Sequence, residues 1–103
     1  MIYIVKENLK KFIVLTEKMT TYFYQQNKNS GYELYDEVLT SLANIMDELS
    51  YLNDQKILEV DIVKINSMLE KALQALMNQD TIMFADVMNF EIINEMEYYY
   101  GSL

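Results

Sequence analysis

The sequence predicts an all-α protein, an antiparallel up-down-up-down four-helix bundle. Proline is absent and glycine occurs twice, so the residues that break helices are almost missing. Apolar residues recur every three or four positions in four segments, as on one face of a helix. Short connections between the segments favour antiparallel neighbours. We expect one domain, 1–103, with helices at about 5–27, 31–52, 56–77 and 80–100.

The segment 31–52 has the most regular pattern. Its apolar residues are spaced alternately by three and four, and on a helix they form one stripe: Tyr35, Val38, Leu42, Ile45, Leu49 and Leu52. Just before it, Ser30 and Glu33 fit a capping box, in which each side chain accepts a hydrogen bond from a backbone amide. We therefore expect Ser30 to be the N-cap of this helix and residues 27–31 to form a turn.

The segments 2–26 and 56–77 carry stripes of the same kind. In the first, the stripe comprises Ile2, Val5, Leu9, Phe12, Thr16, Met19 and Phe23. In the second, it comprises Leu58, Ile62, Ile65, Leu69, Ala72 and Leu76. Three β-branched residues among the four at 2–5 leave an extended start open. No second strand is available to pair with it, so we expect a helix that frays before about Val5. Glu59 and Asp61 are expected in the first turns of the third helix, where acidic side chains complement the helix dipole.

The segment 80–100 is the most hydrophobic and the least regular. Asp80 is expected to be its N-cap. Apolar residues spread round much of its circumference, which is typical of a helix that is central or meets a partner. The three tyrosines at 98–100 precede Gly101 and are expected to mark the end of the ordered chain.

Composition excludes several classes of site. Without cysteine there is no disulfide or thiolate metal site, and without histidine the commonest general base and transition-metal ligand are missing. The net charge of −8 repels phosphate and anionic lipid, so we expect no nucleic-acid or membrane binding. No segment resembles a signal peptide or a membrane span, and we expect a cytoplasmic protein without a cofactor.

Charge also favours one contact between helices. Residues 2–26 hold four lysines and two glutamates, whereas the chain from Asp80 onward holds five acids and no base. In an up-down-up-down bundle the first and last helices are neighbours. We therefore expect attraction between these two helices, although each exposed pair contributes only a few tenths of a kcal/mol.

Candidate catalytic chemistry is sparse. A di-metal site built from Glu-x-x-His on two helices cannot form without histidine. An all-carboxylate magnesium site around Asp86, Glu91 and Glu95 remains open, since Glu91 and Glu95 share a helix face. Helical nucleotide pyrophosphohydrolases use a Glu-x-x-Glu pair followed by a Glu-x-x-Asp pair, and this succession does not occur here. We expect neither catalytic nor metal-binding residues.

The most informative polar residue is Asp86, which lies in an otherwise apolar run. Either it points outward, towards solvent or a lysine of the first helix, or it makes a polar contact with a partner. Methionine and tyrosine are abundant, which suits either core filling or an adaptable binding surface. If a partner binds, we expect contact on the last helix, through Phe84, Asp86, Val87, Met88, Phe90, Glu91, Tyr98, Tyr99 and Tyr100.

Residues 69–80 followed by 84–97 resemble a small all-helical family of low-GC bacteria, with a helix ending in EALENKD and then LLADLLEYEIxPxLE. The corresponding residues are Asp80, Ala85, Asp86, Glu91, Ile92 and Glu97, whereas Asn94 stands where the family often has proline. The resemblance implies no assigned activity. The layout is also similar to that of flagellar export chaperones, which cover a helical segment of a partner.

These patterns favour a non-enzymatic interaction, adaptor or chaperone-like protein that covers an amphipathic helix of a protein partner. Self-association through the same face is the nearest variant. A carboxylate-only metal-dependent hydrolase and a structural subunit of a larger assembly are the alternatives.

Overall fold

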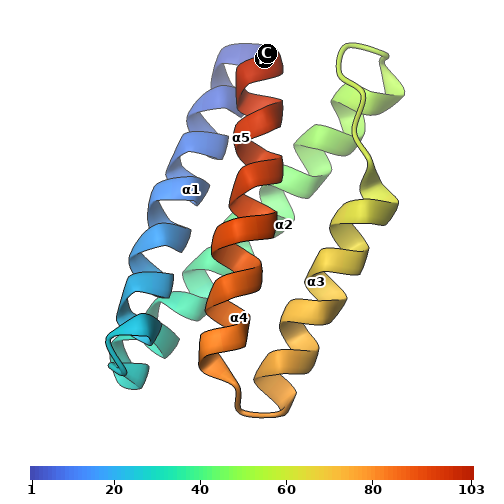
Figure 1. The fold of residues 1–103 in the computed structure, drawn as a ribbon. Helices are drawn as coiled ribbons and strands as arrows, with labels where there is room; N and C mark the ends of the chain where they lie inside the picture. The colour runs from blue at the N-terminus through green and yellow to red at the C-terminus, as the bar shows by residue number, and fades with distance from the viewer.

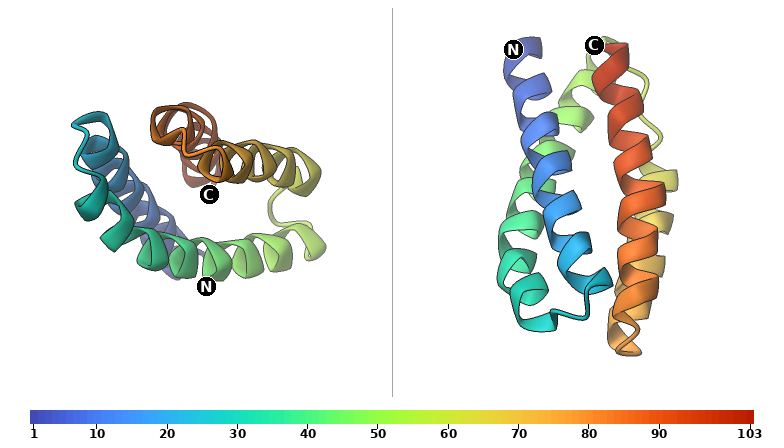
Figure 2. Two further views of the ribbon diagram at one scale, coloured as in Figure 1. Left: turned by 90° about the horizontal axis from the view of Figure 1, so that it is seen from below. Right: turned by 60° about the vertical axis from the view of Figure 1, so that its left-hand side comes forward.

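The computed structural model describes residues 1–103 and is all-α, which confirms the predicted four-helix bundle. Helix α1 spans Ile2–Tyr24, α2 spans Lys28–Asp54 and α3 spans Ile62–Met77. The fourth rod is continuous but has three parts: α4 (Thr81–Val87), a π-helical turn η1 (Met88–Ile92) and α5 (Ile93–Ser102). Successive rods run in opposite directions, and both termini lie at the same end (Figure 1, Figure 2).

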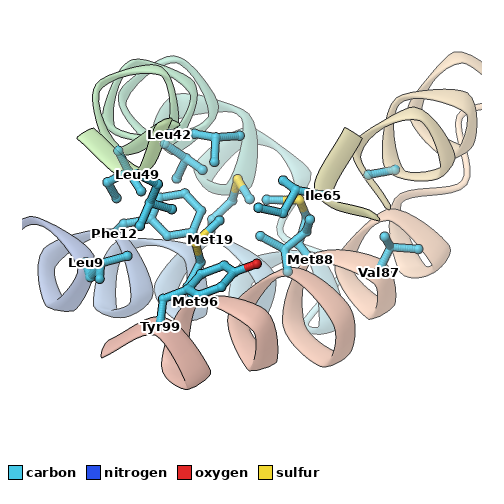
Figure 3. Packing of buried hydrophobic residues seen from close by; sticks show 14 of the residues in the cluster. Leu9, Phe12, Met19, Leu42, Leu49, Ile65, Val87, Met88, Met96 and Tyr99 are labelled. Carbon is cyan, nitrogen blue, oxygen red and sulfur yellow. The ribbon is translucent and has the colours of Figure 1, made fainter. Parts of the chain in front are cut away.

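The predicted stripes form the core. Phe12 and Met19 of α1, Leu49 of α2, Ile65 of α3 and Met88 of η1 are fully or almost fully buried. Figure 3 shows these side chains converging from different helices. Helix α1 packs along α2 and along the fourth rod, and α3 packs on α4 and η1. Helices α2 and α3 approach each other less closely, and this wider seam is visible in the end-on view (Figure 2).

The connection between α1 and α2 differs from the prediction. Helix α1 ends at Tyr24, and α2 already begins at Lys28. Its N-cap is Asn27, whose side chain accepts a hydrogen bond from the backbone N–H of Ser30. The expected N-cap at Ser30 is therefore wrong. Gly31 lies inside α2 and is buried against the ring of Phe23. A Cβ at this position would come within 2.7 Å of that ring, so only glycine allows the two helices to pack this closely.

The third helix begins six residues later than predicted. Residues 55–61 are a non-helical connection whose apolar members Leu58 and Val60 are still buried. The side chain of Asn53 accepts a hydrogen bond from the Val60 N–H at 2.9 Å, which holds this connection against α2. Asp61 then caps α3 by accepting from the Lys64 N–H. The expected helical turns at Glu59 and Asp61 are thus absent.

The ends of the chain are more regular than expected. Helix α1 begins at Ile2 rather than near Val5. Asp80 is the N-cap of α4, as predicted, and accepts a hydrogen bond from the Met83 N–H. The ordered chain does not end at the three tyrosines, because α5 continues to Ser102; Tyr99 is buried in the core.

Candidate partner-binding surface

The nine candidate residues of the last rod separate into a buried group and a group that is exposed or half-buried. Phe84, Val87, Met88 and Tyr99 belong to the core. The ring of Phe84 lies edge-on to that of Phe23 of α1, with centroids 5.7 Å apart. These four side chains anchor the rod to its neighbours, so the exposed members must carry any contact with a partner.

Phe90 and Tyr98 are the exposed aromatic residues of this group, with 61% and 66% of their surface accessible. Both line a groove of about 610 Å³ between α3 and the fourth rod. We call this the aromatic groove. It forms where α5 diverges from α3, on the side of the connection 55–61, and its lining residues are Glu59, Asp61, Lys64, Met68, Phe90, Glu91, Asn94, Glu95, Tyr98 and Tyr99.

A hydrogen-bonded network forms the floor of the aromatic groove. The Tyr99 hydroxyl donates to Glu95 Oε2 at 2.6 Å and accepts from the Asp61 N–H at 3.1 Å. The Glu95 carboxylate, whose side chain is 11% exposed, also pairs with Lys64 Nζ at 3.2 Å. Burial and then the hydrogen bond to Glu95 raise the pKa of Tyr99, since both disfavour the phenolate. The network fixes the start of α3 to α5.

The wall of the groove contains the π-helical turn. Its wider backbone pattern is seen where the Ile93 N–H bonds to the Met88 carbonyl, five residues back. The Asn94 side chain donates to the Phe90 carbonyl at 2.7 Å and so satisfies an oxygen at this irregularity. Glu91 projects towards α3 and accepts two hydrogen bonds from Lys71 Nζ, at 2.8 and 2.9 Å. Single π-turns within α-helices are frequent at functional sites.

Asp86 faces a different neighbour. It is exposed and accepts a hydrogen bond at 2.6 Å from the hydroxyl of Tyr24 on α1. Burial, followed by this hydrogen bond, raises the pKa of Tyr24. Asp86 therefore points outward, but towards a tyrosine rather than a lysine. Since Glu91 and Glu95 face lysines of α3, the fold does not bring the three candidate metal-ligating carboxylates together.

Helix α1 and the last rod are neighbours, as expected, but no ion pair joins them. Both ion pairs of the structure join α3 to the fourth rod. Lys6 instead lies 4.7 Å above the ring of Tyr100, which is half-buried. Lys10, Lys11 and Lys18 line a separate groove on the outer side of α1.

A second hollow lies in the wide seam between α2 and α3. We call it the seam pocket; its volume is about 90 Å³ and its lining is entirely apolar: Tyr35, Val38, Leu39, Leu42, Leu69, Ala72, Leu73, Phe84 and Met88. Two of the candidate residues, Phe84 and Met88, thus contribute to this pocket rather than to the aromatic groove. The two hollows lie on different faces of α3.

Sequence reasoning missed most of the aromatic groove outside the fourth rod. Glu59 and Asp61 come from a segment expected to be helical, and Lys64 and Met68 come from a helix face to which no binding role was given. The start of α3 was marked in the sequence by Asp61, a common N-cap residue, followed directly by the apolar residues Ile62 and Val63.

Residues 2–100 match the model of a family described as a domain of unknown function, DUF8042. The chain belongs to this family. The match supports the expectation of a family without an assigned activity. No curated protein and no solved structure matches the chain. None of its helices is long and apolar enough to cross a bilayer.

Proposed function

We propose that this protein is a non-enzymatic, cytoplasmic interaction protein that covers an amphipathic helix of a protein partner in the aromatic groove. The observation that carries the proposal is the exposure of Phe90 and Tyr98 beside one groove, at 61% and 66%. Large aromatic side chains are enriched at the energetic centres of interfaces because they bury much area with few rotatable bonds.

The shape of the groove suits a helix rather than an extended strand. It is bordered by two helices, α3 and α5, and no sheet edge is present that would pair with a strand. Met68 also lines the groove, and its flexible thioether can adapt to differently shaped apolar side chains. An amphipathic helix would place its apolar face on Phe90, Met68 and Tyr98.

The carboxylates near the groove have structural roles that favour binding over catalysis. Glu91 is paired with Lys71, and Glu95 with Lys64 and Tyr99. Their carboxylate oxygens are engaged by ammonium and hydroxyl donors, so they are not free to coordinate a metal ion. This supports a binding surface over the carboxylate-only hydrolase that the sequence left open.

Site-specific photocrosslinking tests the proposal. Phe90 is replaced by p-benzoylphenylalanine, the protein is irradiated in cells, and the crosslinked segment is identified by mass spectrometry. The control carries the same residue at Tyr3, a somewhat more exposed aromatic position outside the groove. We expect a discrete product at position 90, joined to an amphipathic helical segment. A product that is a second copy of the chain supports self-association in the groove, and equal, diffuse labelling at both positions contradicts the proposal.

A further inference from the structure

We propose that the helix accepted by the aromatic groove is cationic, with lysine or arginine side chains beside its apolar face. This inference rests on the proposed function and specifies the chemistry of the partner. It follows from the charges at the rim of the groove, from the exposed aromatic rings and from the absence of free cations on the inner faces of α3 and α5.

The groove has more negative than positive charge. Four carboxylates line it, from Glu59, Asp61, Glu91 and Glu95, against the single ammonium group of Lys64. Lys64 is paired with Glu95, and Lys71, just outside, is paired with Glu91. The positive charges of these two lysines are therefore already neutralised by carboxylates of the protein itself.

The remaining two carboxylates lie free at one end. Glu59 is exposed and takes part in no hydrogen bond or ion pair. Asp61 is exposed, and its carboxylate accepts only the backbone N–H of Lys64, which carries no charge. A cationic side chain placed at this end would be attracted by two unneutralised charges, whereas an acidic one would be repelled.

The aromatic rings strengthen the same preference. Lysine and arginine lay their aliphatic stems along apolar surface and keep the charged group at its edge. Their cations are also attracted to aromatic faces within about 6 Å. Tyr98 lines the groove together with Glu59 and Asp61, so ring and carboxylates are available to one side chain of a partner. The net charge of −8 adds attraction at longer range.

The groove of Lys10, Lys11 and Lys18 on α1 provides a contrast within the same molecule. It has a similar volume, about 640 Å³, but no aromatic residue lines it. The aromatic groove therefore combines apolar contact with negative charge, which is the complement of a basic amphipathic helix.

Three synthetic peptides of about 18 residues test the inference by fluorescence anisotropy. All share the same leucine face, and the polar face is lysine, glutamine or glutamate. We expect the lysine peptide to bind the full-length protein about tenfold more tightly than the glutamine peptide at low salt, and the glutamate peptide to bind weakest. The advantage of lysine should shrink in 0.5 M salt, because charges at the rim are screened.

Three variants assign the preference to the groove. The double variant Glu59→Gln, Asp61→Asn removes both free charges and keeps the N-cap, since asparagine caps as well as aspartate. It should lower affinity for the lysine peptide about fivefold and leave the glutamine peptide unchanged. The matched control, Glu33→Gln with Asp47→Asn, removes two exposed charges from α2 and should have a much smaller effect. Phe90→Ala should weaken all peptides.

The outcomes separate the two proposals. Equal binding of the lysine and glutamine peptides, both sensitive to Phe90→Ala, overturns the cationic preference and leaves the proposed helix-binding function standing. A lysine preference that the α2 control removes as strongly as the groove variant also overturns the inference, because it reflects net charge alone. Binding that is insensitive to Phe90→Ala contradicts both.

Discussion

The two hollows beside α3 are opposite in character. The seam pocket is small, apolar throughout, and its lining includes Phe84, which is 2% exposed. The aromatic groove is larger, lined mainly by polar side chains, and its apolar members Phe90 and Tyr98 stand in solvent. Apolar surface in the seam therefore contributes to folding, whereas apolar surface in the groove remains available for binding.

The difference follows from how α3 meets its neighbours. Along α4 and η1 it packs closely, so side chains there interlock. Where α5 diverges from α3, the gap is bridged by Lys64, Glu95 and Tyr99 instead of by apolar packing. Polar bridges tolerate water, and a surface that already tolerates water can exchange it for a partner.

The largest effect that separates the two regions is expected from Phe84→Ala. Phe84 is buried between Phe23 and Tyr35, so its truncation removes apolar burial and leaves a cavity beside the seam pocket. We expect a loss of about 3–5 kcal/mol in the free energy of unfolding, measured by urea denaturation. Phe90→Ala, the same change at an exposed position, should alter it by less than about 0.5 kcal/mol. Similar losses in both variants would erase the distinction between the two regions.

A smaller effect is expected from Tyr99→Phe, which tests the polar bridge. The change leaves the Asp61 N–H without its acceptor and removes one donor from Glu95. We expect a loss of about 1–2 kcal/mol at pH 7, measured by urea denaturation.

The same variant predicts a pH dependence with a definite sign. The pKa of Tyr99 is raised in the folded state, whereas an unfolded tyrosine ionises near pH 10. The contribution of the hydroxyl is therefore complete below about pH 10 and declines above it, as the unfolded state loses its proton first. The stability difference between wild type and Tyr99→Phe should narrow above pH 10. A constant difference up to pH 11 would contradict a shielded hydroxyl.

The sequence predicted the helices well because buried residues recur every three to four positions along a helix. Leu9, Phe12, Ile45 and Leu49 were placed on the core faces from spacing alone, and all are buried. The turns were harder for a physical reason. Each of the three connections contains a residue with positive φ, and in every case it is not glycine. The list is Gln26, Lys56 and Gln79.

Those three residues end their helices in the same way. The next N–H in each case bonds to a carbonyl five residues back, as in a Schellman motif: Asn27 to Tyr22, Ile57 to Leu52 and Asp80 to Ala75. Glycine is the usual signal for this motif, and here both glycines are helical instead. Gly31 therefore does not mark the end of a helix, and the N-cap expected at Ser30 lies three residues beyond the actual one, Asn27.

The apolar spacing of the last rod is irregular because its π-helical turn, Met88–Ile92, holds one residue more than an α-helical turn. A π-turn rotates everything after it by about 100° relative to an unbroken α-helix. Phe90 continues the row of Val87 by spacing yet is exposed, while Ile92 and Tyr99 are buried. Sequence spacing therefore identified the rod that carries the candidate surface but not which of its side chains face outward.

The smallest effect on stability is expected from Lys71→Gln, a change that tests the aromatic groove through binding. Lys71 and Glu91 are both partly exposed, so their ion pair should contribute only a few tenths of a kcal/mol to the free energy of unfolding. The same change releases the charge of Glu91 into the aromatic groove. We expect affinity for the lysine peptide to rise about twofold in low salt, measured by fluorescence anisotropy. Weaker binding of the lysine peptide would show that Lys71 itself contacts the partner. The positive charge in the interface would then come from this protein, which contradicts the inference of a cationic partner.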